Sequence, residues 1–131
     1  MLKWLTGGRE ADKPRAEVKP HEAGQPPKLS LDLARIAEQD LVVVFKHSTA
    51  CPVSYAADRE MRGFMARHPE VAVQTVLVRE QRDLSRQIAE WTGIRHESPQ
   101  VLVFRKGAVV TTGSHGDVTE EFVADAIAQT A

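Results

Sequence analysis

One stretch near the middle of the chain, residues 41–54 with the sequence LVVVFKHSTACPVS, constrains the fold most strongly. It opens with five consecutive apolar residues, three of them valine, a pattern typical of a strand buried on both faces. A lysine and four small or polar residues then lead to Cys51, the only cysteine, and to Pro52. Proline is favoured at the first position of a helix, where its missing N–H would have had no partner. The pattern therefore predicts Cys51 at a helix N-terminus, just beyond the carboxyl end of a central strand.

The overall composition is that of one soluble domain. The chain has 131 residues, of which 42% are hydrophobic and 27% charged, and its net charge of −1 argues against electrostatic binding to nucleic acid or to a membrane surface. No apolar run approaches the roughly 20 residues that span a bilayer. The opening residues 1–8 lack the apolar core of a signal peptide, and one cysteine cannot build a disulfide framework. These features favour a reducing, cytoplasmic location.

Two regions differ in character. Residues 1–28 contain four prolines and no hydrophobic periodicity, so we expect a flexible N-terminal tail, with one folded domain over residues 29–131. Ser30 is a candidate N-cap for a first helix. Within the domain the pattern predicts, in order, a helix to about Gln39, a strand Leu41–Lys46, a helix from Pro52 to about Arg67, a strand Val71–Val78, a helix Asp83–Thr92, a strand Val101–Arg105, a strand Ala108–Thr112 and a helix capped by Asp117 or Thr119.

This order predicts an α/β fold with a mixed four-stranded sheet and helices on both faces. The first two strands are joined by a helix and should be parallel, whereas the last two form an antiparallel hairpin through Lys106-Gly107. We expect Gly113–Gly116 to be a loop. The helix after Cys51 is predicted to bury one apolar stripe, formed by Val53, Ala57, Met61 and Phe64.

The environment predicted for Cys51 favours chemistry. The thiolate is the nucleophilic form of cysteine, and the positive end of a helix and its unpaired N–H groups favour an anion. Backbone N–H groups after Pro52 and the Ser54 hydroxyl could donate to the sulfur, and Lys46 and His47 could add positive potential. Most free cysteines are instead small buried apolar residues, and that alternative competes with this interpretation.

Two motifs carry a family resemblance. A strand, then C-P-V-S opening a helix, then Ser98-Pro99 before a later strand resembles the thioredoxin superfamily, in which the residue matching Pro99 is a cis-proline facing the active-site cysteine. The segments KHSTACPVS (46–54) and GIRHESPQ (93–100) more narrowly resemble the monothiol bacilliredoxins, the YtxJ-like family of bacillithiol-system proteins. The resemblance covers about residues 29–129.

The resemblance implies a thiol–disulfide oxidoreductase that removes bacillithiol from protein mixed disulfides. Cys51 would be the nucleophile, bacillithiol the co-substrate and bacillithiolated proteins the clients, with no bound cofactor. Ser54 stands where dithiol relatives carry a resolving cysteine, so an outside thiol must complete the cycle. Ser98, next to Pro99, would offer its backbone N–H and C=O to the bound thiol.

Further substrate contacts are hypotheses. Bacillithiol carries carboxylates, so a cationic rim would help to bind it, and Lys46 and Arg95 are the nearest candidates. His47 and His96 could both reach the same face, while scattered histidines without paired spacing make a metal site improbable. Three other functions remain open: a redox-inactive thioredoxin-fold interaction module, a glutathione-dependent monothiol glutaredoxin-like enzyme and a peroxidase.

Overall fold

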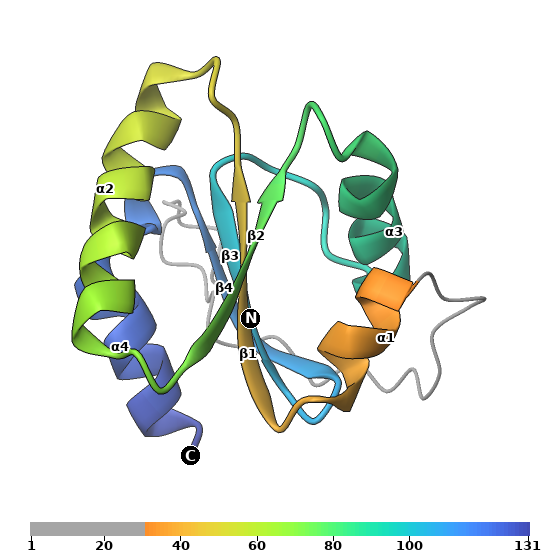
Figure 1. Cartoon of the computed structure of the whole chain (residues 1–131), viewed down its shortest axis with the longest axis vertical. Helices are drawn as coiled ribbons and strands as arrows, with labels where there is room; N and C mark the ends of the chain where they lie inside the picture. Colours follow the sequence, from red (N-terminus) through yellow and green to blue (C-terminus); the bar gives the residue numbers. More distant parts are fainter. Residues whose placement is uncertain (1–30) are drawn as a thin grey trace, which may run out of the picture.

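The computed structural model describes residues 31–131, so the predicted tail over residues 1–28 and the predicted cap at Ser30 lie outside the described residues. Figure 1 shows a single sheet between two layers of helices. Along the chain the elements are α1 (Leu31–Glu38), β1 (Leu41–His47), α2 (Pro52–Arg67), β2 (Ala72–Leu77), α3 (Arg82–Thr92), β3 (Gln100–Arg105), β4 (Ala108–Ser114), the short 3-10 helix η4 (His115–Asp117) and α4 (Glu120–Gln129).

The sheet has four strands in the order β2-β1-β3-β4. β1 runs parallel to β2 and antiparallel to β3, and β3 and β4 form an antiparallel hairpin. The hairpin turn is Lys106-Gly107, with φ angles of 51° and 82°, the positive values that a two-residue turn between twisted strands requires. The mixed four-stranded sheet predicted from the order of elements is thus confirmed.

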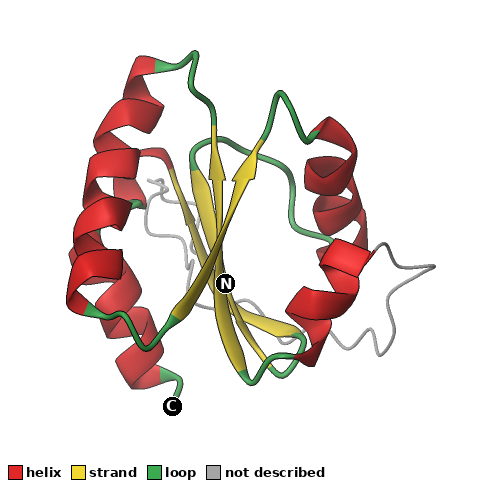
Figure 2. Cartoon of the chain, in the orientation of Figure 1, coloured by secondary structure: helices red, strands yellow, loops and turns green. Residues whose placement is uncertain are grey.

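Alternate residues of the central strands point into two separate cores. Val42 and Val44 of β1 face a core closed by α1 and α3, where Ile36 and Ile88 are fully buried. Residues of opposite parity, such as Phe45, face a second core closed by α2 and α4. Figure 2 shows the two helical layers on opposite sides of the strands. Because β1 is covered on both faces, its run of apolar residues does not alternate with polar ones.

The buried face of α2 differs from the prediction at its first turn. Ala57, Met61 and Phe64 are buried as expected, but Val53 is 48% exposed and Ser54 is fully buried in its place. Ser54 belongs to the stripe because the spacing from 54 to 57, 61 and 64 follows one helical face. The prediction that Val53 belongs to the buried stripe is therefore wrong, because the apolar pattern alone does not mark a serine as a core residue.

The end of β4 also departs from the prediction. Gly113 and Ser114 were expected in a loop, yet they pair with Val101 and Gln100 and extend the hairpin. At Gly113 a Cβ atom would lie only 2.8 Å from the ring of Phe122, so the absence of a side chain lets α4 approach the strand.

The cap of α4 is Thr119, whose side-chain oxygen accepts the Phe122 N–H at 3.0 Å. Within residues 31–131, no helix combines the length and the apolar character that crossing a bilayer requires.

Candidate active site

Cys51 occupies the N-cap of α2, directly beyond the carboxyl end of β1, as its sequence context predicted. Its backbone is extended, with φ −116° and ψ 125°, and Pro52 begins the helix. The Cys51 N–H donates to the Ser48 carbonyl at 3.4 Å, which closes the tight loop after β1. The thiol is half-buried and unpaired. The local sequence thus delivers one sulfur to the positive end of a sixteen-residue helix.

The first turn of α2 does not bond the sulfur in the way the sequence led us to expect. The Cys51 side chain accepts no capping hydrogen bond. Pro52 has no N–H to offer, and the Ser54 N–H donates to the Cys51 carbonyl at 2.9 Å. The Ser54 Oγ accepts the Ser48 N–H at 3.2 Å, and among residues 31–131 its hydroxyl makes no hydrogen bond to the sulfur. The sulfur is therefore left without a hydrogen bond from the first turn, available to an incoming disulfide.

The loop from Ile94 to Pro99 reaches the same edge of the sheet. In the antiparallel register of β1 and β3, Lys46 pairs with Gln100, so Pro99 lies at the end of the sheet from which the chain leads to Cys51. The peptide bond between Ser98 and Pro99 is cis. Pro99 is buried, and its carbonyl accepts the His115 N–H at 2.8 Å, so η4 holds this loop from the β4 side.

Gln100 is a part of this site that the sequence analysis missed. Its side chain is 2% exposed, and its Nε2 donates to the Arg95 carbonyl at 3.1 Å. Its Oε1 accepts the Glu97 N–H at 3.4 Å. One buried amide thus bonds two backbone groups of the loop that carries Pro99. The clue in the sequence was a glutamine, with both donor and acceptor, at the head of an otherwise apolar strand.

His47 lies on the α2 side of the sheet, where it was expected to influence the thiol. It is 6% exposed, and its ring stacks on Phe45 with 5.4 Å between the ring centroids. Its Nδ1 is buried and has no hydrogen-bond partner among residues 31–131. The Ser98 hydroxyl, across the same edge of the sheet, is likewise buried without a partner in this part of the chain.

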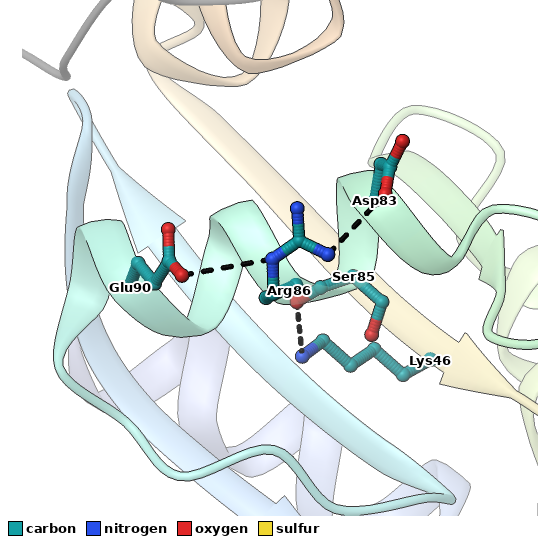
Figure 3. A network of polar contacts seen from close by, with 5 residues as sticks. All are labelled: Lys46, Asp83, Ser85, Arg86 and Glu90. Atoms are coloured by element: carbon teal, nitrogen blue, oxygen red, sulfur yellow. Dashed lines mark hydrogen bonds and ion pairs between the residues drawn. The ribbon is translucent and has the colours of Figure 1, made fainter.

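Lys46 does not stand on an exposed rim, and its predicted place there is wrong. It is fully buried between β1 and α3, and its Nζ donates to the Ser85 carbonyl at 3.0 Å (Figure 3). Burial lowers the pKa of Lys46 from 10.5 to about 8. The residue points inward because positions 42, 44 and 46 of β1 share the face that α3 covers. A carboxylate in solvent therefore cannot pair with this ammonium group.

The two other basic candidates remain at the surface. His96 is exposed, although its Nδ1 lies 3.2 Å from both Lys46 Nζ and Ser85 Oγ. Desolvation of the ring and the nearby positive charge of Lys46 lower the pKa of His96, which favours the neutral imidazole. Arg95 is exposed on the same loop. Within residues 31–131, no three His, Cys, Asp or Glu side chains gather in an arrangement that could hold a metal ion.

The sheet order, the half-buried cysteine at the start of α2 and the cis-proline loop at the same edge define a thioredoxin-fold protein with one active-site thiol position. Solved structures share this fold. One, provisionally described as an oxidoreductase with a thioredoxin fold, is 34% identical over 75% of this chain and 88% of its own, with a TM-score of 0.69. Mitochondrial thioredoxin 3 from Saccharomyces cerevisiae is 15% identical over 76% of this chain and 87% of its own, with a TM-score of 0.59.

The match to a family is narrower than the match to the fold. A family model described as monothiol bacilliredoxin BrxC matches residues 30–123. This span includes Cys51, Ser54 and the Ser98-Pro99 pair. The chain belongs to the monothiol bacilliredoxin family, and the resemblance found in its two motifs is confirmed.

Proposed function

We propose that this protein removes bacillithiol from protein mixed disulfides, with Cys51 as the nucleophile. The observation that carries the proposal is the pairing of one half-buried thiol at the N-terminus of α2 with a buried serine, Ser54, where a resolving thiol would be needed. Membership of a thioredoxin-fold bacilliredoxin family supports thiol–disulfide redox chemistry in general. The choice of bacillithiol follows the family's description.

The reaction runs in two exchanges. The Cys51 thiolate attacks the bacillithiol sulfur of the client's mixed disulfide, the S–S bond to the client breaks, and the client leaves as a thiolate that takes a proton from water. Cys51 is then joined to bacillithiol. A second bacillithiol thiolate attacks the bacillithiol sulfur of this adduct, forms bacillithiol disulfide and releases the Cys51 thiolate. Overall, one mixed disulfide and one free bacillithiol become one client thiol and one bacillithiol disulfide, so the client sulfur is reduced as the sulfur of the second bacillithiol is oxidised.

The structure around Ser54 supports the need for an outside thiol. Ser54 lies three residues after Cys51, fully buried, with its hydroxyl bonded to the Ser48 N–H. A hydroxyl cannot form a disulfide, and the sequence has no second cysteine. The adduct on Cys51 therefore persists until a small thiol or another protein resolves it.

Substrate contacts are assigned to the loop beside the sulfur. We propose that the backbone of Ser98, next to cis-Pro99, pairs with the peptide-like part of the bound thiol, and that Arg95 and His96 contact its carboxylates. Bacillithiolated proteins are the proposed clients, bacillithiol is a co-substrate rather than a bound cofactor, and the proposed compartment is the reducing cytoplasm.

Intact mass spectrometry tests the proposal directly. The purified protein is incubated in parallel with bacillithiol disulfide and with glutathione disulfide, with Cys51→Ser as the matched control. We expect one bacillithiol adduct on the native protein, none on the variant, and release of the adduct by free bacillithiol. An adduct from glutathione disulfide alone would favour a glutaredoxin-like enzyme. Absence of either adduct, together with slow alkylation of Cys51 at about pH 7, would favour a redox-inactive module.

A peroxidase gives a different result. It would consume hydrogen peroxide and carry Cys51 through a sulfenic acid, which a dimedone-type probe traps as a defined mass increase. We expect peroxide turnover by the native protein to be no faster than that of a simple thiol. Rapid turnover would replace the proposed function with a peroxidase.

A further inference from the structure

Lys46 joins three parts of the fold at the edge of the sheet where Cys51 and Pro99 lie. It sits in β1, donates to the carbonyl of Ser85 in α3 at 3.0 Å, and lies 3.2 Å from Nδ1 of His96 in the loop before Pro99. Figure 3 shows its side chain extending to α3 while Arg86 follows the outside of the same helix toward Asp83 and Glu90. The contacts of Lys46 are thus internal and separate from the surface ion pairs.

The chemistry of the two groups determines which nitrogen of His96 carries a proton. An ammonium group has donors only, so its contact with His96 requires Nδ1 to be an acceptor. A neutral imidazole with an acceptor at Nδ1 carries its proton on Nε2. Ser85 Oγ lies 3.2 Å from the same Nδ1, and its hydroxyl can donate there as well.

The charges around His96 favour its neutral state at neutral pH. The groups around Lys46 are the Ser85 carbonyl, the His96 ring and its register partners in the two neighbouring strands, Val76 and Gln100, neither of which is charged. With a pKa of about 8, Lys46 is still mostly an ammonium group at neutral pH, and its charge opposes protonation of His96. Glu97 acts in the opposite direction and raises the pKa of His96, but its carboxylate also lies 3.4 Å from His115 Nδ1.

We propose that Lys46 is a positioning residue that holds His96 as a neutral imidazole with its proton on Nε2, so that the loop beside cis-Pro99 presents a hydrogen-bond donor to a carboxylate of the bound small thiol. The His96 side chain is otherwise exposed, which leaves its second nitrogen accessible to such a ligand. This inference rests on the proposed function for the identity of the ligand, and on the geometry of the described residues for the state of His96.

The state of His96 is measured without any substrate. In 15N-labelled native protein, long-range 1H–15N correlation spectra at about pH 7 should show the neutral His96 ring with its proton on Nε2. In Lys46→Met, which removes the donors and the charge, the titration midpoint of His96 should move to higher pH. Arg86→Met makes the same change on the exposed side of α3 and should leave it unmoved. A proton on Nδ1 in the native protein, or equal midpoints in the two variants, would overturn the inference; the first arm needs no variant to fold.

The second measurement asks whether this state serves catalysis. With a bacillithiolated client protein, Lys46→Met should raise KM several-fold and leave kcat and the alkylation rate of Cys51 unchanged. The control Arg86→Met should not raise KM. Unchanged KM would overturn the assigned role in binding. If the native protein fails to act on the mixed disulfide at all, the proposed function fails, while the spectra still decide whether Lys46 positions His96.

Discussion

The N–H of Ser48 donates a hydrogen bond to Oγ of Ser54 at 3.2 Å, and this bond ties the loop before Cys51 to the helix behind it. The Cys51 N–H and the Ser48 carbonyl close the same loop from the other direction, at 3.4 Å. Ser54, at the position where we propose that a resolving thiol would be needed, is therefore also a structural part of the site. Its hydroxyl oxygen accepts the buried N–H of Ser48, which would otherwise have no partner.

Ser54→Ala should destabilise the protein because it leaves the Ser48 N–H without its acceptor. We expect a loss of about 1–2 kcal/mol in the free energy of unfolding, measured by urea denaturation. Thr49→Ala, an exposed change in the same loop, is the matched control and should alter the free energy by less than about 0.5 kcal/mol. Equal effects of the two changes would contradict a structural role for Ser54.

Cys51→Ser should abolish the adduct with bacillithiol disulfide while leaving the fold intact. The thiol is half-buried and accepts no capping hydrogen bond, so we expect the free energy of unfolding to change by less than about 0.5 kcal/mol. The measurement pairs intact mass spectrometry with urea denaturation on the same preparation. A large loss of stability would mean that the sulfur is a packing residue, in conflict with the proposed chemistry.

Gln100→Leu should loosen the loop that carries Pro99. The change leaves the Arg95 carbonyl and the Glu97 N–H without their side-chain partner, at an expected cost of about 1–3 kcal/mol. We also expect KM for a bacillithiolated client to rise while the alkylation rate of Cys51 stays the same. Gln129→Leu, the same change at an exposed position of α4, serves as the control and should affect neither quantity.

Arg95→Glu should weaken binding of the carboxylate-bearing thiol. Because Arg95 is exposed, the effect should be a several-fold rise in KM at low ionic strength that shrinks as salt is added. Arg35→Glu, an exposed charge reversal in α1, controls for the change in net charge. If both variants raise KM equally, Arg95 has no specific contact with the substrate.

The buried Lys46 should make stability depend on pH above about pH 8. Its pKa is about 8 in the folded protein and 10.5 in the unfolded chain, so the unfolded chain binds more protons between these values. The free energy of unfolding contributed by this group therefore rises as pH increases from 8 toward 10.5, and the cost of burying the charge is fully present below pH 8. Urea denaturation across this range should show a rise for the native protein relative to Lys46→Met. Parallel pH profiles would contradict a buried, titrating lysine.

Some features of the site could be predicted from the sequence because they depend on residues adjacent in the chain. A run of β-branched residues predicts a buried strand wherever it occurs, and Pro52 marks the start of a helix by its fixed backbone angle and missing N–H. Together they placed Cys51 correctly. The paired motifs around Cys51 and Pro99 also point to the family that the match over residues 30–123 shows.

Other features depend on which face of an element a residue occupies. At the first turn of α2 the helix face that points into the core carries Ser54, and Val53 is exposed. Nothing in the apolar pattern marks a serine as a core residue. Lys46 looked like part of a basic segment with His47, but successive residues of a strand point to opposite faces. Lys46 therefore lies under α3, and His47 lies on the α2 side of the sheet.

The sequence alone determined the order of elements, the position of the single thiol at a helix start and the lack of a second thiol to resolve an adduct, since each follows from residues close together in the chain. Only the tertiary structure decided that Lys46 contacts Ser85 and His96, which lie 39 and 50 residues away. The same holds for the amide of Gln100, which bonds the loop before Pro99. These polar contacts form because the sheet brings distant segments together and removes water from them, so the buried groups of Lys46 and Gln100 bond the partners that packing provides.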